Sequence, residues 1–251
     1  MINLNDCYNK ALLGAAIPLN NICMVYPLKI KEVIAMGEDN YLAQLNLLTL
    51  TSMDLVETYK KKKIPVPDDI DVFDNLMESC ERDNSFLLDL ENAFFTFLRE
   101  EVQILSDLKL ISVGNGLEKR IIDKNIFYDL QDILRVQNRI PTVERPPENE
   151  TAMEKKFRLR REEVARAKQK QKQKEKNGES ASLHDLISSL CCLGIGVTLQ
   201  NVGDLSVYSF HELLDRSQAK EEYETDMRML LAGADSKKIK PSYWIKNLKK
   251  K

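Results

Sequence analysis

The sequence predicts a mainly α-helical protein: a helical N-terminal domain with a small β-hairpin, a charged helical or disordered connector, and a small three-helix C-terminal domain. Three observations predict this class. Apolar residues recur at three- and four-residue spacing along much of the chain, which is the period of an amphipathic helix. Glycine and proline stand mainly between these stretches, where they end helices. From residue 154 to residue 176 the chain carries eleven basic and four acidic side chains, and such blocks seldom join a globular core.

The first predicted domain covers residues 1–140 and contains most of the helices. Pro27 can occupy the first turn of a helix, where its missing N–H costs nothing, and Gly37 is a suitable C-terminal cap for the same helix. Further helices are expected over residues 40–50, from Thr51 or Ser52 through Lys60, from Asp68 or Asp69 through Cys80, over residues 85–102, and from Asp123 through Leu134.

The predicted β-hairpin lies near the end of this domain. Two short runs of β-type residues, 109–113 and 117–122, flank the glycine-rich residues 114–116. Two such runs around a short glycine-containing turn are typical of a hairpin.

The predicted connector, residues 141–180, begins with a proline- and acid-rich stretch and continues with the basic run. Three interpretations of the basic run stay open: a solvated linker, nonspecific contact with nucleic-acid phosphates, or contact with an acidic partner. Phe157 is its only aromatic residue, so stacking on bases has little support. The basic residues of this candidate site are Lys155, Lys156, Arg158, Arg160, Arg161, Arg166, Lys168 and Lys170.

The C-terminal domain, residues 181–251, is predicted to contain three helices. They are expected from Ser182 to Gly194, from Asp204 or Ser206 through Leu214, and from Tyr223 to Gly233. Three short helices bury little apolar surface by themselves. Trp244, the only tryptophan, is expected to anchor the C-terminal tail against them.

The sequence offers no candidate catalytic, cofactor-binding or metal-binding residues. His184 and His211 are the only histidines, and no recognisable nucleophile motif stands beside either one. Cys191 and Cys192 are interpreted as a core residue and its partly exposed neighbour. The aspartates at 68–74 lack the glycine and the terminal glutamate of an EF-hand loop, and helix capping already accounts for them. We therefore expect a protein that is not an enzyme.

Composition favours a soluble, reduced, cytoplasmic protein. The longest apolar runs are far short of the ~20 residues that a membrane-spanning helix needs, and no N-terminal stretch has the pattern of a secretory signal. The five cysteines are odd in number and form no CxxC motif. This argues against a disulfide framework or a cysteine-rich zinc site.

Several stretches resemble proteins encoded in the tail gene cluster of long-tailed bacteriophages and prophages of Gram-positive bacteria. In the first half these are residues 25–38 (VYPLKIKEVIAMGE) and 127–138 (FYDLQDILRVQN). The resemblance is closer in the second half, over residues 204–216, 230–238 and 243–248. His211 departs from the family pattern, in which an aromatic or apolar residue is expected.

The resemblance implies a tail assembly chaperone. In many such phages two products share an N-terminal domain, and a translational frameshift appends the C-terminal domain to one of them. The longer product helps the tape measure protein assemble with tail tube subunits and then leaves the particle. The implied partners are therefore the tape measure protein and the tail tube protein, in the host cell cytoplasm, with no membrane partner and no cofactor; self-association stays open. The apolar residues considered as partner contacts are Phe94, Phe97, Phe210, Leu214, Tyr223, Met227 and Trp244.

The alternative is a nucleic-acid-associated or regulatory phage protein that acts through residues 154–176. Binding that weakens steeply with salt would favour this alternative, because phosphate contacts release counterions. Co-purification with a helical phage protein would favour the chaperone.

Overall fold

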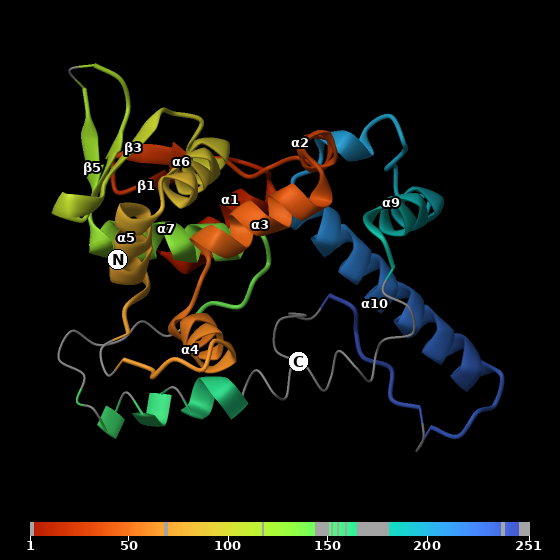
Figure 1. The fold of residues 1–251 in the computed structure, drawn as a ribbon. Helices are drawn as coiled ribbons and strands as arrows, with labels where there is room; N and C mark the ends of the chain where they lie inside the picture. The colour runs from red at the N-terminus through yellow and green to blue at the C-terminus, as the bar shows by residue number, and fades with distance from the viewer. Residues whose placement is uncertain are drawn as a thin grey trace.

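The structure is a computed structural model that describes residues 3–67, 70–116, 118–143, 151, 153–154, 156–158, 160–164, 181–236 and 239–245. It is mainly α-helical with two small antiparallel sheets (Figure 1). The predicted fold class is therefore confirmed. The predicted limits of the connector, at residues 141 and 180, remain predictions.

The N-terminal half, which we call the body, comprises the described residues up to 143. Its helices are α1 (Leu4–Leu12), α2 (Ile30–Met36), α3 (Glu38–Leu48), α4 (Ser52–Lys61), α5 (Val72–Arg82), α6 (Asn84–Leu98) and α7 (Lys124–Gln137), with a 3-10 turn η1 (Ser106–Leu108). Its strands are β1 (Ile17–Leu19), β2 (Cys23–Val25), β3 (Val102–Leu105), β4 (Leu110–Val113) and β5 (Arg120–Ile122). The C-terminal half contains α9 (Leu183–Cys192), the 3-10 turn η2 (Val202–Asp204) and α10 (Val207–Leu231).

Four helices begin at a predicted capping residue: α4 at Thr51, α7 at Asp123, α9 at Ser182 and α10 at Ser206. At the start of α4, the Thr51 hydroxyl accepts a hydrogen bond from the Asp54 N–H at 3.2 Å, and the Asp54 carboxylate accepts one from the Thr51 N–H at 2.8 Å. Asp123 caps α7 by accepting a hydrogen bond from a first-turn N–H at 2.9 Å. Helix α5 begins after Asp71, whereas residues 68–69, the predicted start, lie outside the described residues.

The two sheets are β1–β2 and β3–β4–β5, in those orders. The predicted hairpin corresponds to β4 and β5, in which Ile111 lies opposite Ile122. The prediction of one helix over residues 85–102 is wrong at its C-terminal end. Helix α6 stops before Arg99, whose φ of 57° is left-handed, and β3 follows it and pairs with β4. Hydrogen bonds between strands therefore take the place of a last helical turn.

Helices α6 and α7 carry the centre of the core, and each of them contacts both helices and strands of the body. The Phe127 ring on α7 lies 5.3 Å from the Phe73 ring and 6.3 Å from the Phe94 ring, measured between centroids. All three rings are fully buried, and so is Phe97. Phe94 and Phe97 are therefore core side chains rather than surface contacts, because α6 is covered by α3, α5 and strands.

The C-terminal half joins the body through a short antiparallel bridge. The Ile30 N–H donates to the Leu205 carbonyl at 2.9 Å, and the Val207 N–H donates to the Leu28 carbonyl at 3.0 Å. Phe210 is fully buried in the same apolar cluster as the body residues. It is therefore another core side chain and not a surface contact, because the first turns of α10 pack on α1 and α7.

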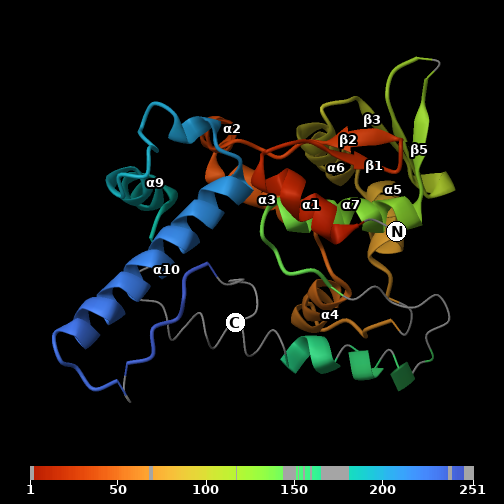
Figure 2. The ribbon, with the colours of Figure 1, turned by 180° about the vertical axis from the view of Figure 1, so that it is seen from behind.

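Helix α10 is one continuous helix of 25 residues, where the sequence analysis predicts two. Residues 215–222 contain no glycine or proline and consist largely of good helix formers, so nothing interrupts the helix there. Pairs four residues apart add support, such as Arg216 with Glu212 at 2.9 Å. The C-terminal half therefore contains two α-helices and a 3-10 turn among its described residues, and α10 extends away from the body (Figures 1 and 2).

Candidate partner-binding surface

Arg139, just after α7, holds the first turns of α10. Its guanidinium lies 2.8 Å from the Asp215 carboxylate and 3.3 Å from the Glu212 carboxylate. It also lies over the Tyr208 ring, 5.7 Å from the ring centroid. The Arg139 backbone has a φ of 55°, which is unfavourable for a residue with a side chain. The three contacts offset this cost and fix the direction in which α10 leaves the body.

Along its length, α10 presents two apolar stripes on opposite sides. Successive residues of a helix are rotated by about 100°, so Phe210 and Leu214 share the side that packs against the core. Tyr223, Met227 and Leu230 share a side about half a turn away, and we call these three residues the distal stripe. None of the three belongs to the core cluster. The second half of α10 therefore offers apolar surface that the body does not cover.

The C-terminal tail, residues 239–245, turns back and runs beside α10 (Figures 1 and 2). The Tyr243 ring meets the Tyr223 ring edge-on, with centroids 5.7 Å apart and planes at 80°. The Arg216 guanidinium donates a hydrogen bond to the Trp244 carbonyl at 3.1 Å. Trp244 is half-buried, and its role as an anchor of the tail stays a prediction. The tail thus covers part of the distal stripe.

The C-terminal half has few buried apolar residues relative to its exposed ones. Among the described residues, only five of forty buried apolar residues lie beyond residue 180, whereas eight of twenty-two exposed large apolar residues lie there. These eight are Leu193, Ile195, Leu199, Met227, Met229, Leu231, Tyr243 and Ile245. Five of the eight lie on the second half of α10 or on the tail beside it. A group of exposed apolar side chains of this kind is typical of a site for binding other proteins.

The structure separates the seven predicted partner contacts into two groups. The first group consists of the core residues Phe94, Phe97 and Phe210, together with Leu214, which is partly buried against the core. Tyr223, Met227 and Trp244 form the second group, on the distal stripe and on the tail that covers it. The second group alone lies where a partner can reach it. Arg139 and Arg216, which position this surface, were not predicted, because charged residues on helices are usually solvated and give no distinguishing pattern.

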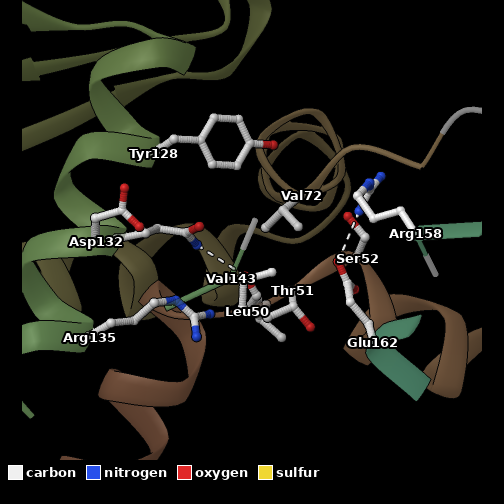
Figure 3. A pocket seen from close by; sticks show the side chains of 11 residues that line it. Leu50, Thr51, Ser52, Val72, Tyr128, Asp132, Arg135, Val143, Arg158 and Glu162 are labelled. Atoms are coloured by element: carbon white, nitrogen blue, oxygen red, sulfur yellow. Dashed lines mark hydrogen bonds and ion pairs between the residues drawn. The ribbon is translucent and has the colours of Figure 1, made fainter. Parts of the chain in front are cut away.

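The described basic residues of the connector do not form one exposed face. Lys156, Arg160 and Arg161 are exposed, but Arg158 is only 5% exposed and pairs with Glu162 at 3.1 Å. Figure 3 shows Arg158 and Glu162 across a cleft from side chains of α7. Arg158 therefore contributes to packing, which a run of charges does not predict. The other four predicted residues lie outside the described residues: Lys155, Arg166, Lys168 and Lys170.

This cleft between α4 and α7 has a structural role. Its free space is about 40 Å³, room for about three water molecules and too little for a metabolite. The Gln131 amide donates to the Leu48 carbonyl at 2.8 Å and to the Leu50 carbonyl at 3.1 Å, and Arg135 donates to the Thr49 carbonyl. These bonds satisfy backbone carbonyls at the turn between α3 and α4.

The histidines and cysteines do not assemble a reactive group. His184 is exposed on α9, far along the chain from His211, whose pKa is lowered by burial and by the nearby Arg139 guanidinium. Burial raises the pKa of the Cys23 thiol to about 12 and that of the Cys80 thiol to about 11, so both stay protonated and unreactive at neutral pH.

The acidic cluster at the start of α5 is satisfied by the protein itself. Asp71 caps the helix and pairs with Lys124 at 2.9 Å, and Asp74 pairs with Lys124 and with Lys109 at 2.9 and 2.7 Å. Within the described ranges, no group of three or more His, Cys, Asp or Glu residues could hold a metal ion. In the same ranges, no helix is long and apolar enough to cross a membrane.

The C-terminal half has a recognisable relative. Residues 170–249, which include α9, η2, α10 and the tail, match a family model described as the YomV second domain. The match spans less than half of the chain, and the matched family is phage-associated. No curated protein and no solved structure matches the chain.

Proposed function

We propose that this protein is a non-enzymatic phage tail assembly chaperone that binds the tape measure protein through the distal half of α10. One observation carries the proposal: within the region that matches a phage-associated family, the second half of α10 and the tail carry exposed apolar side chains that lie outside the core cluster. The resemblance of residues 204–216 and 243–248 to tail assembly chaperones supplies the partner.

The shape of the surface suits a helical client. A tape measure protein is long and helical, and before the tail tube encloses it, its amphipathic helices expose apolar faces. An apolar stripe along a helix receives such a face through side chains spaced three and four residues apart. Tyr223, Met227 and Leu230 have that spacing on α10.

The proposal also accounts for the division between a stable body and an exposed C-terminal half. A chaperone must keep its own fold when its binding surface is exposed to a client. The client-binding side chains therefore cannot be the ones that hold the core together. The distal stripe meets this requirement, because α10 is anchored through Phe210 and Arg139 and not through the stripe.

Co-expression with the tape measure protein tests the proposal. We expect the natural chain to keep the tape measure protein soluble, and a variant with Leu231→Glu and Met227→Glu to fail. Leu231 is 84% exposed and Met227 is 36% exposed, so charges there should leave the fold intact. Leu108→Glu, at a position 67% exposed on the body, is the matched control and should retain activity.

Two results would contradict the proposal. Full activity of the double variant would place the binding surface elsewhere. Stoichiometric recovery of the protein from purified tails would make it a structural subunit.

A further inference from the structure

We propose that residues 239–245 are a built-in competitor for the distal stripe: the tail occupies the stripe in the free chain and leaves it when a partner helix binds. The partner segment is an amphipathic helix that presents aromatic side chains between basic residues. That the segment comes from the tape measure protein rests on the proposed function; the competition itself does not.

The chemistry of the tail indicates what the stripe accepts. The tail places Tyr243 against Tyr223 and carries Lys240 upstream of it. On α10, Glu224 and Asp226 lie on either side of the stripe, each rotated from its centre by roughly a quarter of a turn, and Glu224 also pairs with Lys220 at 3.7 Å and with Arg228 at 3.6 Å. Residues 220–228 carry four acidic and two basic side chains, and this excess of negative charge favours an aromatic segment flanked by positive charge.

The tail covers the stripe only loosely, as a competitor must. Tyr243 remains 50% exposed, Ile245 is 54% exposed, and Met227 of the stripe is 36% exposed. Core side chains such as Phe210 are fully buried. A longer partner helix can bury more of the stripe than the tail does, and this difference drives the exchange.

Departure of the tail leaves the fold intact. The stripe lies outside the core cluster, and α10 is attached to the body by Phe210, by Ser206 at its N-cap and by Arg139. These contacts lie in the first three turns of the helix. The tail reaches α10 beyond them, at Arg216 and Tyr223.

Arg216 links the tail to the anchored end of α10. Its side chain donates to the Trp244 carbonyl at 3.1 Å and to the Glu212 carboxylate at 2.9 Å. Glu212 in turn pairs with Arg139 at 3.3 Å. The guanidinium is thereby held by bonds from two of its nitrogens, a fixed planar geometry that the single ammonium of a lysine does not reproduce.

Trp244 makes the competition measurable because it is the only tryptophan. We would label the full chain with 5-fluorotryptophan and titrate it with a synthetic peptide of residues 239–248. We expect the chemical shift of its single fluorine resonance to change toward the value in the unfolded chain as the peptide displaces the tail. Because a tethered tail has an effective concentration in the millimolar range, the peptide must be added at millimolar concentration.

Variants of two methionines with equal exposure give the control. Met227 on the stripe and Met24 on β2 are both 36% exposed. In Met227→Glu we expect the fluorine chemical shift to be near that of the unfolded chain before any peptide is added. Addition of the peptide should then change the shift no further. Met24→Glu should behave as the natural chain does. If Met227→Glu keeps the natural signal, or if the peptide binds without moving the signal, the competition does not exist.

A chain ending at Ser236 gives the second test. We expect it to bind the fluorescein-labelled peptide at least tenfold more tightly than the full chain. Equal affinities overturn the proposal. If this chain does not fold, the full-length Arg216→Ala variant replaces it. We expect this variant to bind the peptide more tightly than the natural chain by a similar factor. An unchanged affinity would overturn the proposal. Tighter peptide binding without any binding of the tape measure protein would support the competition and refute the proposed function.

Discussion

The body and the C-terminal half use apolar residues in different ways. In the body, the aromatic side chains of Phe73, Phe94 and Phe127 pack in one cluster and are fully buried. In the C-terminal half, Tyr223 and Tyr243 also pack together, yet the tail ring stays half exposed. The same residue types are therefore fully buried in one region and partly exposed in the other.

The reason for the difference lies in the number of elements that surround each side chain. A residue on α6 or α7 has helices and strands on several sides. On the second half of α10, Tyr223 contacts the tail, and the residues of the distal stripe lie outside the core cluster. Burial, and not residue type, therefore decides which region contributes to folding free energy.

Substitution of one aromatic residue in each region should give the largest contrast. Phe127→Ala removes a fully buried ring and should destabilise the protein by about 3–5 kcal/mol. Trp244→Ala removes a half-buried ring from the tail and should cost less than about 1.5 kcal/mol. Urea denaturation followed by circular dichroism measures both. Equal losses would mean that the tail is part of the core.

The attachment of α10 should be weakened by Arg139→Ala. The change removes the ion pairs with Asp215 and Glu212 and should cost about 1–3 kcal/mol, seen as faster hydrogen exchange in α10 with little change in α6. Arg139→Gly should cost less than Arg139→Ala, because glycine adopts the left-handed φ of 55° without strain. Identical costs would show that the backbone conformation contributes nothing.

A smaller effect should appear on acidification. The pKa of His211 in the folded protein lies below its ordinary value of 6.5, because burial and Arg139 disfavour the charged imidazolium. The unfolded chain therefore binds a proton first, and stability should decline as the pH falls below about 6.5. His211→Phe should reduce this decline between pH 7 and 5, as measured by thermal unfolding. Exposed His184→Gln is the control and should behave as the natural chain does.

The smallest effect is expected from salt on partner binding. Apolar burial is not screened, so raising sodium chloride from about 50 to 500 mM should change the affinity for the tape measure protein by less than about tenfold. The nucleic-acid alternative predicts a steep linear fall of log affinity with log salt concentration. A steep fall would instead support binding through the basic connector.

Much of the helical fold could be predicted because caps and stripes are local signals. Thr51, Asp123 and Ser182 each cap the helix that is predicted to begin at that residue. Strands β1 and β2 were not predicted, since three residues each are too few to show a period. The bridge between Leu28–Ile30 and Leu205–Val207 was not predicted either, because two backbone hydrogen bonds far apart in the sequence leave no pattern.

The candidate site could be predicted only in part. Spacing identified Tyr223 and Met227 as one stripe, but the same reasoning selected Phe94, Phe97 and Phe210, which are buried. An apolar stripe on a helix shows which side meets another surface, and it does not show whether that surface is in the same chain. Only the packing of whole elements distinguishes the two cases.

The most direct test of the partner-binding surface is site-specific cross-linking. Benzoylphenylalanine placed at Met227, and separately at the equally exposed Met24, would be irradiated in cells that co-express the tape measure protein. We predict a cross-linked product from position 227 and none from position 24. Cross-linking from position 24 alone, or equally from both positions, would contradict the assignment of the binding surface to the distal half of α10.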